Sequence, residues 1–265
     1  MKPETRNLKL ETGKIQPPEL DPHDRQRYAW QFDVPKLGEE GQRKLKGATV
    51  FVTRVGGVGG TVAYELAAAG VGRLIIAHAG ELRIDDLNRQ LLMTSDWVGK
   101  PRVECAARRL RELNPNVEVI PIGENATDEN AARLIAGADV VVDAAPLFSE
   151  RYALNRACVA AGKPLVECAM FALELHVTTI LPGRGPCLAC LYPDDPAWWS
   201  RRFPVLGAVA GTAGCLGAVE VIKVLTGCGE PLAGRMLIAD LGSNSFRTVR
   251  VRRKPDCPVC GKKIA

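Results

Sequence analysis

The stretch "VTRVGGVGGTVAYELAAAGVGRLIIAHAG", residues 52–80, has the pattern of a strand, a glycine-rich loop, a helix and a second strand. Apolar runs at 48–53 and 73–77 predict the two strands, and the alanine-rich stretch 58–69 predicts the helix. Such a unit is the usual frame for nucleotide binding, because the helix N-terminus stabilises phosphate. Here, however, Arg54 stands where these loops place their first glycine, and the second strand ends without an acidic residue.

The rest of the chain continues the alternation of strands and helices. Further strands are predicted at 117–121, 139–143 and 164–168, and further helices at 98–113, 127–136, 149–161 and 207–226. Beyond residue 164 the pattern alternates as sheet, and "GRMLIADLGSNSFRTVRVRR" (234–253) predicts a late hairpin. The predicted fold is α/β and Rossmann-like, a doubly wound and mainly parallel sheet with a C-terminal antiparallel extension.

Composition excludes several classes of protein. The 265 residues are 46% hydrophobic and 25% charged, as in ordinary soluble proteins. The net charge of +5 is mild and spread along the chain, so nucleic acid is not an expected partner. We identify no apolar run of the roughly 20 residues that span a bilayer, and the N-terminus is polar and proline-rich, so we expect a cytoplasmic protein without a membrane partner.

Four of the nine cysteines form two Cys-x-x-Cys pairs, Cys187 with Cys190 and Cys257 with Cys260. In a cytosolic chain two such pairs predict a structural four-cysteine zinc site, because each short loop presents two thiolates to one ion. Redox-active pairs and disulfides are the alternatives. Cytosolic reduction argues against disulfides, and neither pair opens a predicted helix as a redox motif does.

We expect one domain, residues 23–265, after a flexible segment at 1–22. Its Rossmann-like core covers about 47–170, and the crossover loop and zinc-stapled C-terminal part cover about 171–265. Within that part, "YPDDPAWWSRRFPVLG" (192–207) is a proline-broken loop, long enough to be functional.

A collinear set of motifs makes the sequence more specific. The motifs are "RYAWQ" (27–31), "VGGVGG" (55–60), "AAAGVGRL" (67–74), "DLNRQ" (86–90), "VGKPRVECA" (98–106), "LNPNVEV" (113–119), "CLAC" (187–190), "GCLGAVEVIKVLTG" (214–227) and "PDCPVCG" (255–261). In this order they resemble the ThiF/MoeB/HesA superfamily of ubiquitin-like-protein activating enzymes, which includes the sulfur-carrier adenylyltransferases.

The resemblance implies an activity, a carrier and a dimer. These enzymes use ATP and magnesium to adenylate the C-terminal glycine of a ubiquitin-like carrier protein. They pair through the sheet domain, and the helix predicted at 207–226 is too apolar for a solvated surface. We therefore expect a homodimer or a heterodimer with an intact family member.

The residues that the resemblance places in the nucleotide pocket depart from the family pattern. The first glycine of the loop is replaced by Arg54, while Gly56, Gly57 and Gly59 are kept. The ribose-binding aspartate falls on His78.

Further replacements fall on the groups that contact phosphate and metal. Asp86 replaces an asparagine, and Arg89 is kept. Arg102 replaces a lysine. The magnesium-binding aspartate falls on Pro146, so that only Asp143 of its Asp-x-x-Asp pair survives. An arginine that the family offers across the dimer is Trp30. These changes argue against ATP and magnesium.

Three hypotheses remain open, and with them the question whether the chain is an enzyme. The first is a pseudoenzyme or partner subunit of a sulfur-carrier or cofactor-biosynthesis pathway. The second is a repurposed pocket for a small anion, in which Arg54, His78, Arg89 and Arg102 converge with Asp86 and Asp143. The third is adenylation by a non-standard site, for which the catalytic candidates are Arg89, Arg102 and Asp143.

Overall fold

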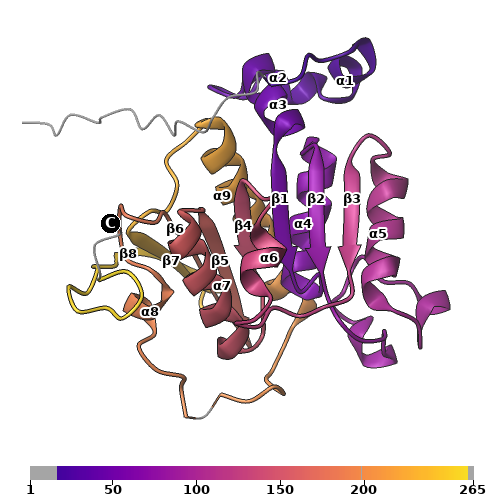
Figure 1. Ribbon diagram of the computed structural model, residues 1–265. Coiled ribbons are helices and arrows are strands. Elements are labelled where there is room, and N and C mark those ends of the chain that lie inside the picture. The colour runs from indigo at the N-terminus through magenta and orange to yellow at the C-terminus, as the bar shows by residue number, and fades with distance from the viewer. Residues whose placement is uncertain (1–16, 198, 262–265) are drawn as a thin grey trace, which may run out of the picture.

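The computed structural model describes residues 17–197 and 199–261, and its strands form one sheet (Figure 1). The strand order is β3-β2-β1-β4-β5-β6-β7-β8. The strands are β1 (Thr49–Thr53), β2 (Arg73–Ala77), β3 (Glu118–Ile122), β4 (Val140–Asp143), β5 (Leu165–Phe171), β6 (Glu174–Ile180), β7 (Arg235–Asp240) and β8 (Ser245–Arg250). β1 to β5 pair in parallel, and β5 to β8 pair antiparallel, which confirms the predicted fold class.

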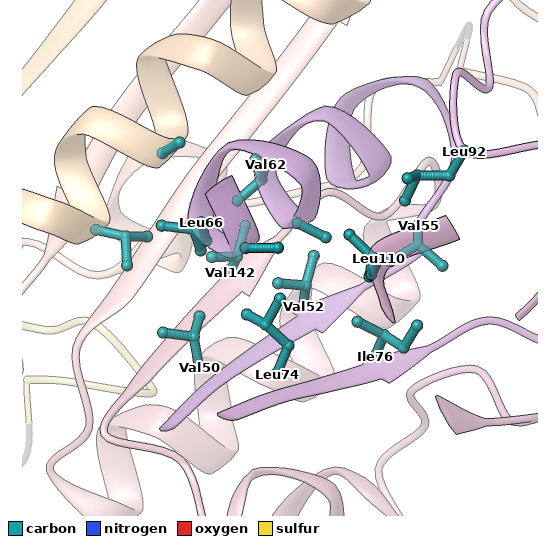
Figure 2. Packing of buried hydrophobic residues seen from close by; sticks show 14 of the residues in the cluster. Val50, Val52, Val55, Val62, Leu66, Leu74, Ile76, Leu92, Leu110 and Val142 are labelled. Atoms are coloured by element: carbon teal, nitrogen blue, oxygen red, sulfur yellow. The ribbon is translucent and has the colours of Figure 1, made fainter. Parts of the chain in front are cut away.

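Helices cover both faces of the sheet. They are α1 (Pro22–Arg27), α2 (Ala29–Phe32), α3 (Gly38–Gly47), α4 (Gly57–Ala69), α5 (Arg102–Leu113), α6 (Ala131–Ile135), α7 (Phe148–Ala161), α8 (Leu188–Leu191) and α9 (Gly207–Thr226), with short 3-10 turns η1 (Ile84–Asp86) and η2 (Ser95–Trp97). Alternate residues of β1 belong to opposite cores. Val50 and Val52 pack with α4, α5 and α9, whereas Phe51 packs with α6 and α7. Figure 2 shows Val62 and Leu66 of α4 over Val50 and Val52.

The strand order reverses beside β1, and this reversal positions the candidate site. From β1 the chain moves outward through β2 to β3, and then returns to place β4 on the other side of β1. Open α/β sheets bind ligands at the carboxyl ends of the strands on either side of such a reversal, here β1 and β4, and this edge of the sheet is called the crevice below. The segment 192–206 joins α8 to α9 and runs below the arrowheads of the parallel strands in Figure 1.

Helix α9 corrects the expectation that no apolar segment reaches membrane-spanning length. By length and composition its 20 residues pass that test, as core helices of soluble proteins also do. α9 packs on α4 and β5, with glycines at the closest approach. A Cβ on Gly217 would lie 2.4 Å from Cys168 Sγ, and one on Gly214 would lie 2.6 Å from Thr61 Cβ.

Some predicted boundaries were wrong for local reasons. α5 begins at Arg102 rather than 98, because Gly99 has a positive φ of 82° and Pro101 is the N-cap. α6 covers only Ala131–Ile135 of the predicted 127–136, and β5 continues to Phe171.

The N-terminal helices were missed. α1 and α2 have only 6 and 4 residues, too few for a hydrophobic period to stand out, and the capping box formed by Asp21 and Asp24 starts α1 inside the segment expected to be flexible. Residues 17–21 also pack on α3, since the side chains of Arg43 and Lys46 donate to the carbonyls of Pro17 and Glu19. Residues 1–16 lie outside the described part of the chain.

Candidate functional site

The glycine loop between β1 and α4 contains an arginine in a left-handed conformation. Arg54 has a φ of 58°, a region that favours glycine and costs other residues about 1–3 kcal/mol. Its guanidinium donates twice to Glu150 of α7, at 2.7 Å from Nε and 2.5 Å from Nη2. Both side chains are nearly buried, at 11% and 7% exposure. A bidentate, buried ion pair therefore holds this loop.

Gly59, in the first turn of α4, leaves space for the backbone of the same loop. A Cβ there would lie 2.7 Å from the Arg54 carbonyl oxygen and 2.9 Å from that of Thr53. The loop backbone thus crosses the start of α4 at a distance that only glycine allows.

At the carboxyl end of β2, His78 is buried beside Arg102. Arg102 begins α5 and folds back to donate to the carbonyls of Gly80 and Glu81. His78 is 4% exposed, and its Nδ1 has no hydrogen-bond partner among the described residues. Burial, followed by the charges of Arg102, Arg54 and Arg201, lowers the pKa of His78 well below its ordinary value. The imidazole is therefore neutral at pH 7.

Asp86 is the centre of a second charged cluster. Its Oδ1 accepts hydrogen bonds from Arg89 at 3.0 Å and Gln90 at 2.8 Å. Its Oδ2 accepts from the Arg83 backbone N–H and lies 3.2 Å from the Arg102 guanidinium. One carboxylate thus neutralises part of the charge of two arginines.

Asp143, at the end of β4, lies in a separate buried network. It accepts a hydrogen bond from the Ala145 backbone N–H, and Arg151 of α7 lies 3.5 Å from its other oxygen. Arg151 also donates to Glu167 at 2.6 Å. Burial raises the pKa of Asp143, and raises that of Glu167 to about 7. The cation that pairs with Asp143 is therefore Arg151 of α7, and Asp143 reaches the Arg54 pair only through the charge of Glu150.

The segment between α8 and α9 (192–206), called the crossover segment from here on, contacts the loop that follows β4. The indole Nε1 of Trp199 donates to the Pro146 carbonyl at 2.8 Å. The Trp199 ring stacks on Phe203 at 5.0 Å and meets Phe148 edge-on at 5.5 Å. An aromatic cluster therefore lies beside Pro146.

The four paired cysteines converge as the sequence predicts. Their sulfur atoms lie within 4.8 Å of one another, and all four residues are buried. Sulfurs of Cys187 and Cys257 are 3.6 Å apart, and those of Cys190 and Cys260 are 3.4 Å apart. A tetrahedral metal with 2.3 Å bonds to sulfur spaces its ligands by about 3.8 Å, so the cluster could hold a metal ion. One expectation was wrong, since Cys187 is the N-cap of α8 and its pair does open a short helix.

Known proteins match nearly the whole chain. The model of the ThiF family matches residues 28–259. The heterocyst HesA protein of Trichormus variabilis is 50% identical over 242 residues, 91% of each chain. The chain belongs to the ThiF family.

One further relative of this ThiF-family chain has a named activity, and solved structures share its fold. The sulfur carrier protein adenylyltransferase of Thermus thermophilus is 41% identical, over 89% of this chain and 90% of that protein. A crystal structure of E. coli MccB with ATP has a TM-score of 0.76 at 25% identity, covering 89% of this chain and 72% of that one.

Sequence reasoning did not identify the partners of the site residues in this ThiF-family chain. Glu150 and Arg151 lie in the first turn of α7, and Arg201 lies in the irregular crossover segment. The sequence did offer one indication of Glu150 and Arg151. They are adjacent charged residues shortly after Pro146, and the turn there places them at the carboxyl end of β4.

Proposed function

We propose that this ThiF-family protein lacks standard ATP-dependent adenylation. We propose that it acts as a partner subunit or pseudoenzyme in a ubiquitin-like sulfur-carrier or cofactor-biosynthesis pathway. The observation that carries the proposal is the ion pair between Arg54 and Glu150 at the glycine loop. The Arg54 guanidinium is neutralised by Glu150 and is not available to a phosphate. The Glu150 carboxylate also lies beside the turn where a triphosphate would bind.

The neighbouring residues support the same conclusion. Asp86 adds a second carboxylate near the phosphate position, and Pro146 offers no oxygen ligand from its side chain to magnesium. Its carbonyl already accepts a hydrogen bond from Trp199. ATP with magnesium does not fit these residues. Each lost charged contact to a transition state costs about 3–4 kcal/mol, so several losses together stop the reaction.

Two named relatives support the proposed pathway. The relative from Thermus thermophilus is named a sulfur carrier protein adenylyltransferase, and the relative from Haloferax volcanii is named a SAMP-activating enzyme E1. We propose a ubiquitin-like carrier protein as the macromolecular partner and the cytoplasm as the location. We propose structural zinc for the cysteine cluster, since four buried thiolates suit a closed tetrahedral zinc site.

Calorimetry with ATP and magnesium tests the proposal. We expect no measurable heat of binding and no ATP–pyrophosphate exchange with any carrier that ends in Gly-Gly. The combined variant R54G/H78D/D86N/P146D should begin to bind ATP, because it restores the family pattern. An intact family adenylyltransferase is the positive control. Tight ATP binding by the unmodified protein, with adenylate formed on a carrier, would contradict the proposal.

Light scattering tests the assembly that we propose. The hollow between α4 and α9 has a volume of about 300 Å³ and a mixed lining, in which Glu65 lies beside Ala68 and Val219. Val219 is half-exposed. We expect a dimer at about 50 µM, homomeric or with an intact family member, because α9 leaves apolar side chains such as Val219 exposed. A monodisperse monomer, alone and with an intact relative, would contradict it.

A further inference from the structure

The His78 imidazole has an incomplete set of partners. It lies in the crevice at the carboxyl end of β2, almost fully buried, and its Nδ1 has no partner among the described residues. A polar atom left in this state costs about 1–3 kcal/mol. The Val55 backbone, on the same glycine loop, acts in the direction that raises the pKa of the imidazole, but burial and the arginines outweigh it. His78 is thus placed to contact something that the chain does not supply.

Positive charge around His78 exceeds negative charge. Three guanidinium groups act on the imidazole, those of Arg54, Arg102 and Arg201, and two carboxylates, Glu150 and Asp86, pair with the first two of them. Arg201 acts electrostatically on both His78 and Arg102 from the crossover segment. It is exposed, and no carboxylate of the described residues pairs with it.

We propose that a small tetrahedral oxyanion, a free phosphate or the phosphate of a monoester, binds in this crevice between His78, Arg102 and Arg201. Guanidinium groups suit this ligand, because their planar fork matches two oxygens of a phosphate. The inference rests on the proposed absence of ATP from the crevice, and adds the class of ligand that replaces it.

Binding takes up a proton at His78. The charged groups that face the imidazole are Arg54 after β1, Arg102 on α5 and Arg201 on the crossover segment; Glu150 and Asp86 pair with the first two. Without an anion these arginines oppose a positive imidazole. A bound oxyanion reverses the local field, so His78 becomes charged and Nδ1 becomes a donor. The affinity therefore rises as the pH falls.

Sulfate is the test probe, because it stays a dianion between pH 6 and pH 8. We expect saturable sulfate binding by calorimetry that tightens by up to about tenfold for each unit of falling pH, as uptake of one proton requires. The variant R201Q should weaken binding about tenfold. Its matched control is R202Q, at the adjacent exposed arginine, which should bind sulfate as the unmodified protein does. H78Q should bind sulfate with little pH dependence.

Several results would overturn the site. They are no saturable binding at about 50 mM sulfate, equal affinities for R201Q and R202Q, or an affinity independent of pH in the unmodified protein. Parallel titrations with inorganic phosphate and AMP distinguish a free phosphate from a phosphate monoester as the ligand. AMP binding tighter than phosphate binding identifies a monoester, and AMP binding equal to or weaker than phosphate binding identifies the free anion. ATP that binds and displaces sulfate would contradict the proposed function while supporting the anion site.

Discussion

The double substitution C187S/C190S is expected to remove the metal and lower the thermal midpoint by roughly 10 °C. The four sulfurs form one buried cluster, and four thiolates so close together repel one another unless a cation lies between them. Binding of a metal to these four sulfurs adds to the free energy of unfolding. For a chain of this size, losing about 3–5 kcal/mol of it lowers the thermal midpoint by roughly 10 °C. The unmodified protein should contain about one zinc ion per chain.

The matched control for this experiment is C215S/C228S. It also removes two thiols, but from the surface of α9 and the turn after it. Its metal content and thermal midpoint should equal those of the unmodified protein. Purified protein without metal, or equal stability for the two double variants, would rule out the structural metal.

Replacing Glu150 with alanine should have the second large effect, a loss of about 3 kcal/mol in the free energy of unfolding. The change leaves the Arg54 guanidinium nearly buried and without its carboxylate, and an uncompensated buried charge is strongly destabilising. Arg54 also keeps its left-handed backbone. Chemical denaturation measures the difference.

Two further variants isolate the cause. The control D128A breaks the exposed ion pair between Asp128 and Arg156, which lies on the same helix as Glu150. It should lower the free energy of unfolding by less than about 1 kcal/mol. The double variant R54G/E150A removes both the charge and the backbone strain, and should return to within about 1 kcal/mol of the unmodified protein. E150A as stable as D128A would show that the ion pair does not hold the loop.

Periodicity predicted the elements that position the site, but not the contacts within it. The strands that flank α4, and α9 itself, were predicted to within two residues, because long apolar patterns specify them locally. The cysteine cluster was also predicted, since ligand spacing is visible in sequence. The pairing of Arg54 with Glu150 joins residues 96 positions apart, and nothing local to either one specifies the other. Arg201 was missed because an irregular loop has no period to interpret.

Both ends of the crossover segment are fixed, which determines how the covering of the site can change. Its first end follows Cys190 in the cysteine cluster, and its other end leads into Gly207 of α9, where a Cβ would lie 2.5 Å from the Asn88 carbonyl oxygen. The middle of the segment alternates proline with aromatic and basic residues, and its described residues contribute no strand to the sheet. We therefore expect that exchange of residues 193–205 between relatives changes what the crevice admits while leaving the sheet and the cysteine cluster intact.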